Sequence, residues 1–237
     1  MEFEPFHLSI RTRMCRTVSL ARFLIGLSVA LAVTACSNIA SPAHFGAVRE
    51  TLPNTSSKIA VGGPDLQSLL TDGSFETPLV PGDGFLLFSV GSTFSKWHVV
   101  GTSGDIAIVS GTFSQNGFTF PAGCGKQWVD LTGVATTGAG VAQTVSAAKG
   151  SHHVLTFSVG NVVDPNGIFG TTSTVNVLVN GVQTFKAVNK KGVGLKIQVW
   201  KKFRTTIIAP SNSMTITFVN GDPAGDDNNG LDCIKLN

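Results

Sequence analysis

Charged side chains are scarce in this sequence of 237 residues: Asp, Glu, Lys and Arg make up 13% of it, about half of the roughly 25% typical of soluble domains. Tyrosine is absent, and Glu76 is the only glutamate after Glu50. Such a low charge, together with 42% hydrophobic residues, excludes a disordered chain and a coiled coil. What the sequence does contain, mainly Val, Thr, Ile and Phe among 27 glycines, favours strands over helices.

No apolar run near the N-terminus is long enough to span a bilayer. Residues 23–33 form a run of eleven apolar or small residues after Arg16 and Arg22, which suits the hydrophobic region of a signal peptide. The run ends in Val33-Thr34-Ala35-Cys36, which resembles the lipobox of bacterial lipoproteins. The resemblance implies a lipoprotein signal peptide over 1–35 and acylation of Cys36. The alternative is an ordinary cleavage site with a chance cysteine.

The segment 36–65 is rich in Ser, Ala, Pro, Thr, Asn and Gly and has no lasting apolar period, so we expect a flexible linker that carries the lipid. Ser37 after the cysteine, by resemblance to Gram-negative lipoproteins, implies the outer membrane of a bacterial cell envelope. From Cys36 onward 13 basic residues balance 12 acidic ones. The basic character lies in the leader, so we do not expect nucleic acid as a partner.

The remainder, 66–237, predicts one all-β domain. Short segments with alternating apolar residues recur between clusters of Gly, Asn, Asp and Pro, and Asn180-Gly181 is a strong hairpin signal. Burial of every second side chain is the pattern of a two-sheet antiparallel sandwich, and the strand number fits a jelly roll. The predicted strands are Trp97–Val100, Asp105–Val109, Gln127–Leu131, Val141–Val145, His153–Val159, Thr174–Val179, Val182–Ala187, Lys202–Ile208, Met214–Val219 and Leu231–Leu236.

Five short motifs follow one another in this domain. They are Leu-Leu-Thr-Asp-Gly-Ser-Phe-Glu at 69–76, Lys-Trp-His-Val at 96–99, Gln-Trp-Val-Asp-Leu-Thr-Gly at 127–133, Ala-Gln-Thr-Val at 142–145 and Gly-Leu-Asp-Cys-Ile-Lys-Leu at 230–236. Their order and spacing resemble the DUF642 proteins and the bacterial choice-of-anchor C surface proteins. The resemblance implies a galactose-binding-like jelly roll of the carbohydrate-binding type, usually without enzymatic activity.

The polar residues predict no catalytic centre. The three histidines of the domain lie in no nucleophile motif, and no sequence feature pairs two carboxylates for acid–base chemistry. We therefore expect a binding protein and not an enzyme.

Tryptophan is the residue type that we consider for sugar binding. If Val129 and Leu131 point inward, Trp128 and Asp130 point outward together, as a stacking platform beside a hydrogen-bond acceptor. Trp200 is the second candidate. The alternative is that every tryptophan only packs the sandwich.

Two cysteines remain in the exported domain, Cys124 and Cys233. In an oxidising compartment this pair predicts a disulfide, the alternative being two buried thiols. The family resemblance further implies a structural Ca²⁺ between the glutamate of the opening motif, Glu76, and the aspartate of the closing motif, Asp232. The acidic loop 221–230 is open to two interpretations, a second calcium loop or a solvated turn.

Seven basic residues and no acidic one lie between Lys186 and Arg204. They suit either a solvated face or contact with an acidic polysaccharide or a phosphate-bearing membrane surface. Two functions remain open at this point. One is a lipid-anchored module that binds a cell-surface or matrix polysaccharide, and the other is a structural or adhesive envelope protein with a protein partner.

Overall fold

The computed structural model describes residues 67–134, 138–164, 169–223, 225 and 228–237. The predicted signal peptide, Cys36 and the whole predicted linker lie outside these residues. Ala60–Asn237 form one compact unit, and the two sheets, the apolar clusters and the disulfide described below all lie within it. No helix in the described part of the chain is long and apolar enough to cross a membrane.

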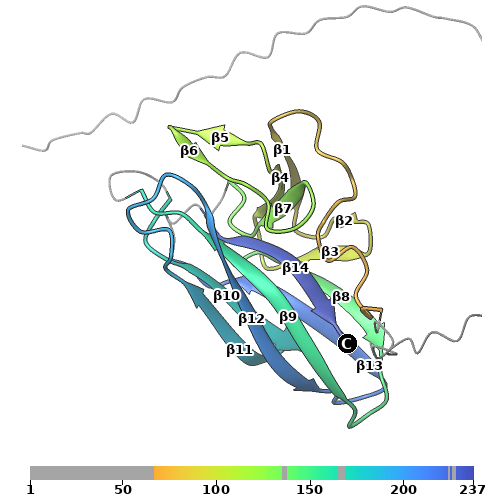
Figure 1. The fold of residues 1–237 in the computed structure, drawn as a ribbon. Helices are drawn as coiled ribbons and strands as arrows, with labels where there is room; N and C mark the ends of the chain where they lie inside the picture. Colours follow the sequence, from red (N-terminus) through yellow and green to blue (C-terminus); the bar gives the residue numbers. More distant parts are fainter. Residues whose placement is uncertain (1–66, 135–137, 165–168, 224, 226–227) are drawn as a thin grey trace, which may run out of the picture. The chain divides into compact units, whose positions relative to one another are not determined.

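The described residues form an antiparallel β-sandwich (Figure 1). One six-stranded sheet has the order β1-β4-β7-β14-β9-β12, the other has the order β11-β10-β13-β8-β3-β2, and β5 and β6 form a separate hairpin. From β7 to β10 and from β11 to β14 successive strands alternate between the sheets, which is the connectivity of a jelly roll. The strands are β1 Phe85–Ser89, β2 Thr93–Phe94, β3 Trp97–Val100, β4 Asp105–Ser110, β5 Ser114–Gln115, β6 Phe118–Thr119, β7 Gln127–Asp130, β8 Gly140–Ser146, β9 His152–Asn161, β10 Ser173–Val179, β11 Val182–Asn189, β12 Val199–Ile208, β13 Ser213–Asn220 and β14 Gly230–Leu236.

The predicted all-β sandwich is confirmed, and each predicted strand corresponds to an observed one. The core between the sheets contains the alternating residues expected from the sequence, such as Val129 of β7, Phe157 of β9 and Phe218 of β13. The rings of Phe157 and Phe218 meet edge to face across the two sheets, with centroids 5.3 Å apart. Asn180 and Gly181 both have positive φ, 48° and 82°, and join β10 to β11 as the hairpin signal predicted.

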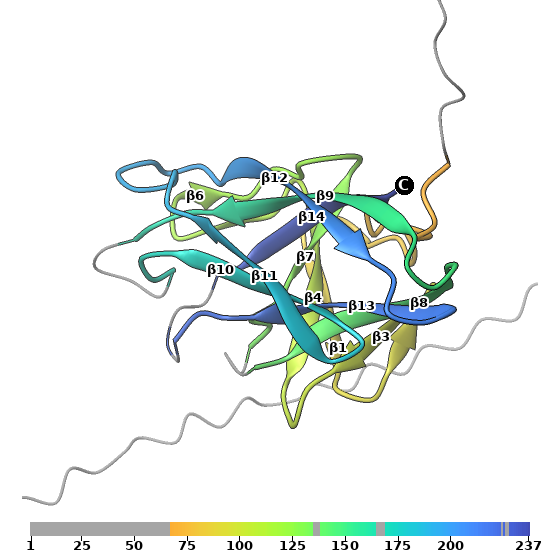
Figure 2. The same ribbon diagram turned by 90° about the horizontal axis from the view of Figure 1, so that it is seen from below.

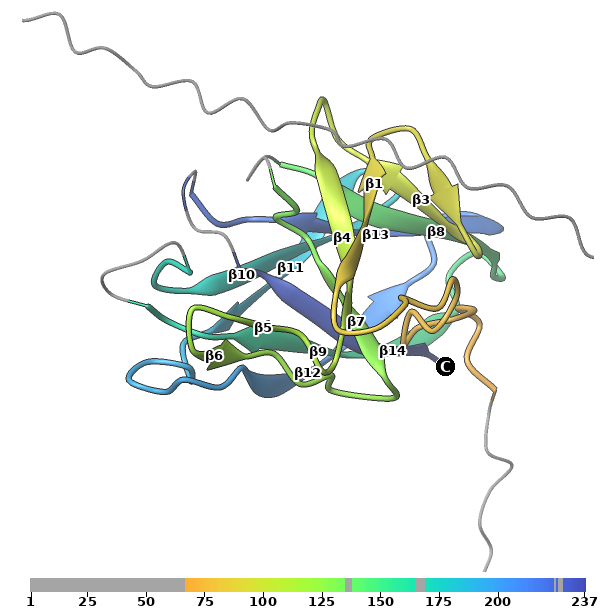
Figure 3. The same ribbon diagram turned by 90° about the horizontal axis from the view of Figure 1, so that it is seen from above.

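A second apolar cluster lies on the opposite face of the first sheet. Strand parity explains its existence: Ile108 and Val129 point into the sandwich, while their neighbours Val109 and Trp128 point away from it. Residues on both sides of the β5–β6 hairpin fold over this outer face (Figure 3). The cluster consists of Ala107, Val109, Phe118, Phe120, Trp128, Val162 and Phe169, with Phe113, Ala122 and Trp200 packed against it. One end of the sandwich is therefore three layers thick.

Candidate functional site

A pocket of about 230 Å³ opens in the outer layer, over strands β1, β4 and β7. Two larger hollows, of about 450 and 550 Å³, are more open and have no Phe or Trp side chain in their walls. The first pocket is therefore the best-formed candidate, although it is smaller than the roughly 300–1,000 Å³ of typical small-molecule sites. Its aromatic walls are Phe85, Phe113, Phe120, Trp128 and Phe169, and its polar residues include Gln115, Asp130 and Asn228.

Two polar residues of this pocket, Asp130 and Asn228, differ in how many of their hydrogen-bonding positions have a partner. Asp130 Oδ1 accepts hydrogen bonds from the backbone N–H of Thr132 (3.0 Å), the hydroxyl of Thr132 (2.7 Å) and the backbone N–H of Asn229 (3.1 Å). Asn228 Nδ2 donates to Gln198 Oε1 at 3.1 Å. Asn228 Oδ1 and Gln198 Nε2 are both buried and have no hydrogen-bond partner among the residues that the structure describes.

Each of the two amides has one unpartnered position, whichever way the two side chains are oriented. Turning both over keeps one hydrogen bond between them and again leaves one donor or acceptor position on each residue without a partner. Leaving a buried polar group unpaired costs on the order of 1–3 kcal/mol. Of the two residues, Asn228 lines the pocket, and a ligand hydroxyl, which can donate or accept a hydrogen bond, would satisfy its unpartnered amide position.

The structure corrects the predicted exposure of Trp128. Its side chain does point away from the sandwich core, but it is only 1% exposed because the outer layer covers it. Its ring stacks on Phe120 (interplanar angle 19°, centroids 6.3 Å apart), and its Nε1 donates to the Phe120 carbonyl at 3.0 Å. Trp128 is thus part of the pocket floor and not an open stacking platform.

Trp200, the second predicted platform, is half-buried on β12. Its ring meets Trp128 edge to face at 5.9 Å, and its Nε1 donates to the Pro121 carbonyl at 2.8 Å. A Cβ on Gly123, Gly160 or Gly230 would lie within about 3.2 Å of this ring. Trp200 therefore fills the gap above three glycines and is not among the residues that line the pocket.

The two carboxylates predicted to hold calcium contact the same segment, the loop 123–126 and the first residue of β7, Gln127. Asp232 Oδ2 accepts from the backbone N–H groups of Gly123 and Cys124, both at 2.8 Å, and Oδ1 accepts from the N–H of Cys233 at 2.6 Å. Glu76 Oε1 accepts from the N–H groups of Lys126 (2.8 Å) and Gln127 (3.3 Å). The Cys124–Cys233 disulfide joins this loop to β14, so the predicted pairing of the two cysteines is confirmed.

Burial raises the pKa of Asp232 from its usual 3.8 to about 7, against the lowering effect of its three backbone N–H donors; the nearby Glu76 carboxylate adds a smaller upward contribution. The peptide donors compensate the charge only in part, because an ionised carboxylate inside the protein has lost its hydration.

This arrangement does not fit a calcium site as it stands. Calcium takes six to eight oxygen ligands, whereas three of the carboxylate oxygens here already accept peptide N–H groups. Within the described residues no three or more His, Cys, Asp and Glu side chains gather closely enough to hold a metal ion. Calcium at Glu76 and Asp232 stays a prediction. The alternative calcium loop, 221–230, includes residues 224, 226 and 227, which lie outside the described part.

The family model described as "Protein of unknown function (DUF642)" matches residues 68–233, which is most of the chain. The chain belongs to the DUF642 family. Comparison with curated proteins gives no match.

Among solved structures, this DUF642 domain is similar to three family 35 carbohydrate-binding modules. One, from an environmental isolate, has 18% identity and a TM-score of 0.37, over 48% of this chain and 74% of that one. The module from Paenibacillus barcinonensis has 10% identity and a TM-score of 0.38, over 64% and 98%. The module from Clostridium thermocellum has 13% identity and a TM-score of 0.38, over 65% and 97%. TM-scores below 0.5 carry no conclusion about what this chain binds.

The DUF642 domain brings some predicted site residues together and separates others. Trp128 and Asp130 do line one pocket, while Trp200 lies beside it. Sequence reasoning missed Phe85, Gln115 and Asn228. Phe85 and Asn228 had only local signals, an uninterrupted apolar run at 85–88 and two consecutive asparagines directly before the closing motif. Gln115 had none.

Proposed function

We propose that the DUF642 domain binds carbohydrate, without altering it, in the pocket above Trp128, and that a lipid on Cys36 holds it in the bacterial cell envelope. The observation that carries the proposal is the combination of aromatic walls with the unpartnered Asn228 amide in one pocket. Sugars have apolar C–H faces that pack on aromatic rings, and hydroxyls that donate and accept hydrogen bonds. The small volume suits a single ring or a chain end.

The rim of the pocket supplies a sharp test. Phe85 is 44% exposed and lines the pocket, while Leu87, two residues further along the same face of β1, is 46% exposed and does not. We expect Phe85→Ala to weaken the affinity for a bound glycan about tenfold, as for other rings stacked on aromatic side chains. Leu87→Ala is the matched control and should bind like the wild type. Trp128→Ala is unsuitable, because it would disrupt the outer layer.

The measurement is a glycan array with the fragment Ala60–Asn237, followed by calorimetric titration of the best ligand. This fragment contains all of the sandwich, its clusters and its disulfide, and one cooperative thermal transition verifies its folding. Equal affinities of the Phe85→Ala variant and the wild type would remove the pocket from the site. No ligand across a broad array would refute the proposal.

A second function, adhesion to a protein, is favoured by one observation. Strand β1 lies at the edge of its sheet, and two of its large apolar side chains, Phe85 and Leu87, are exposed. An open edge with apolar side chains is a surface on which a strand from another chain can add. In that case Leu87→Ala would impair binding of the protein partner as much as Phe85→Ala. For a sugar bound in the pocket, only Phe85→Ala should weaken binding.

A further inference from the structure

The loop between β11 and β12, residues 190–198, exposes three large aliphatic side chains. Val193 is 62% exposed, Leu195 43% and Ile197 47%. Lys190, Lys191 and Lys196 are exposed in the same loop. Figures 1 and 2 show the loop projecting beside β6. We call residues 190–197 the tip.

Buried asparagine side chains fix the conformation of the tip on the side that faces the protein. The N–H of Gly192 donates to Asn161 Oδ1 at 2.9 Å, and the N–H of Lys191 donates to Asn189 Oδ1 at 3.0 Å. Asn161 and Asn189 are themselves fully buried. A Cβ at position 192 would lie 2.4 Å from the Asn161 carbonyl oxygen, so only glycine lets the chain pass this close.

The outer side of the tip is held by the β5–β6 hairpin. The N–H of Thr119 donates to the Lys196 carbonyl at 3.0 Å, and the N–H of Gln198 donates to the Thr119 carbonyl at 2.9 Å. Thr119 and Ile197 thereby form an isolated parallel bridge. Two buried asparagines, a glycine and a strand bridge therefore hold the tip in a conformation that leaves three aliphatic side chains exposed to water.

The positive charge around the tip indicates which kind of surface the tip can bind. Between Asp164 and Asp222 the sequence contains seven basic residues and no acidic one. Aliphatic side chains among lysines match the boundary of an anionic bilayer, where acyl chains lie just beneath the phosphate groups. Three side chains are far too few for a stable protein interface, which buries roughly 800 Å² on each partner.

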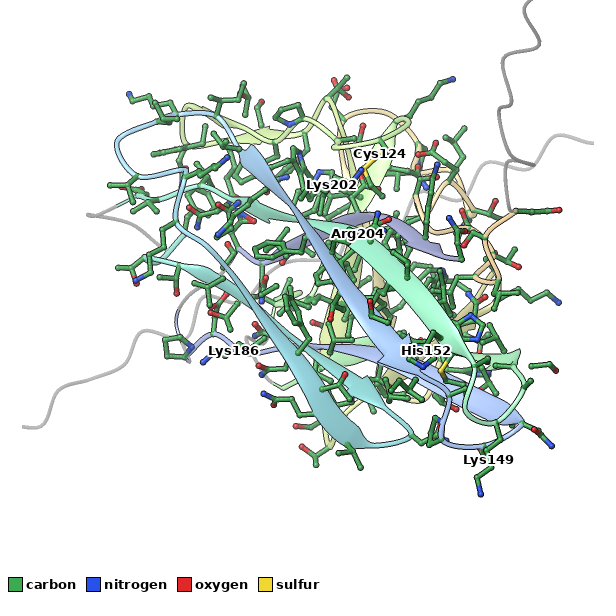
Figure 4. The ribbon with its side chains drawn as sticks, turned by 60° about the horizontal axis from the view of Figure 1, so that its bottom comes forward. Cys124, Lys149, His152, Lys186, Lys202 and Arg204 are labelled. Carbon is green, nitrogen blue, oxygen red and sulfur yellow. A yellow bond between two sulfur atoms is a disulfide. The ribbon has the colours of Figure 1, made fainter. Side chains whose placement is uncertain are left out.

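The other basic residues of this stretch lie elsewhere. Lys186 lies on β11, and Lys202 and Arg204 lie next to each other on β12 (Figure 4). Lys149, which is outside this stretch, lies at the far end of the sheet, near His152 (Figure 4). Lys201 is engaged, because its Nζ donates to the Val188 carbonyl at 3.0 Å. Three exposed aliphatic side chains lie among the lysines of the tip, whereas the face of β12 that carries Lys202 and Arg204 has one, Ile208, at the far end of the strand. The tip is therefore the part best suited to a lipid surface.

We propose that the tip docks the domain on an anionic lipid bilayer, with Leu195 and its aliphatic neighbours in the acyl boundary and the three lysines at the phosphates. The proposal goes beyond sugar binding and does not depend on it. A lipid on Cys36 would bring such a surface within reach, but the tip has its own affinity for it.

The test uses the fragment Ala60–Asn237, which lacks Cys36, and its sedimentation with vesicles. We expect binding to vesicles of equal parts phosphatidylcholine and phosphatidylglycerol, and none to phosphatidylcholine alone. Leu195→Ser should lower the partition coefficient about tenfold, since it removes one large apolar side chain from the boundary. Val182→Ser is the matched control: Val182 is 66% exposed, but it lies at the opposite end of β11 and should have no effect.

Charge is tested separately. Lys191→Gln should weaken binding to the anionic vesicles about fivefold, since a lysine near such a surface contributes about that factor. Raising the salt concentration from about 0.05 to about 0.5 M should also weaken it. Lys149→Gln, on the β8–β9 turn, is the control without effect. A fluorophore on Leu195→Cys should shift to the blue on anionic vesicles, and one on Val182→Cys should not.

Several outcomes overturn the proposal. They are absence of binding to anionic vesicles, binding that survives Leu195→Ser but is lost with Lys149→Gln, and an unshifted fluorophore on Leu195→Cys. Equal retention of wild type and Leu195→Ser on a sulfated polysaccharide, together with no vesicle binding, would assign the lysines to a polyanion instead. Because none of these measurements involves the pocket, they are independent of the proposed sugar binding.

Discussion

At the scale of single residues, Asp232 makes the free energy of unfolding depend on pH. Its pKa is raised from 3.8 to about 7, so between these values the folded protein keeps a proton that the unfolded chain has lost. The free energy of unfolding should therefore fall as the pH rises from about 4 to 7 and stay at the lower value above that. Chemical denaturation at pH 5 and pH 8 measures the difference. Asp232→Asn, which has no titratable carboxyl group, should remove most of it.

Thermal melting of the wild type and of the same variant, Asp232→Asn, tests calcium at Glu76 and Asp232. If the peptide N–H groups are the lasting partners of these carboxylates, millimolar calcium should leave the melting temperature of the wild type unchanged relative to EDTA. A bound ion would instead stabilise the folded state by mass action and favour the ionised form of Asp232. A calcium-dependent rise in melting temperature that is absent from Asp232→Asn would establish the metal site.

Trp128 shows what sequence parity can and cannot predict. The alternation with Val129 and Leu131 correctly indicates that Trp128 points away from the sandwich core. It carries no information on whether another layer covers that outer face. The cover comes from Phe120 and Phe169, whose contacts are set by the tertiary fold and not by the local pattern. Pairing of Cys124 with Cys233 was predictable, because the chain has no other cysteine after Cys36.

At the scale of elements, alternation predicted the strands that have one buried face. The bounds of β3 are those expected from the sequence, and β10, β13 and β14 differ from the prediction by a residue at one or both ends. Strand β1 was missed because Phe-Leu-Leu-Phe has no alternation of apolar and polar residues, a pattern that cannot distinguish a strand from a helix. The two-residue strands are too short for any periodic signal.

The disulfide connects two elements that are far apart in the sequence, the loop before β7 and the last strand. Cys124 and Cys233 are separated by 109 positions, so the bridge removes much of the freedom of the unfolded chain. Replacing both by serine should lower the free energy of unfolding by about 2–5 kcal/mol. Urea denaturation of the oxidised wild type and the double variant measures this. Unchanged stability would show that the loop is held mainly by the Asp232 hydrogen bonds.

At the scale of the whole molecule, the β5–β6 hairpin links the two proposed sites. Gln115 of β5 and Phe120, which directly follows β6, line the pocket, and Thr119 of β6 holds the tip through the Lys196 carbonyl. A domain docked through the tip would therefore present its pocket close to the bilayer. If both proposals hold, we expect the ligands to be glycans that are attached to a membrane surface.

The anchor itself is predicted from the segment before the described residues. Cys36 follows an apolar run and a lipobox-like sequence, and several acyl chains on one cysteine hold a protein on a bilayer essentially permanently. We expect Cys36→Ala to abolish incorporation of labelled palmitate in the producing bacterium and to release or mislocalise the protein. Cys15→Ala, in the leader, is the matched control and should be labelled like the wild type.

A high-salt wash separates the two modes of membrane attachment, because it weakens a contact made through lysines but not an acyl anchor. A Cys36→Ala variant that is still labelled and still partitions into the detergent phase would refute the lipobox, and the domain would then depend on its tip alone to reach the membrane.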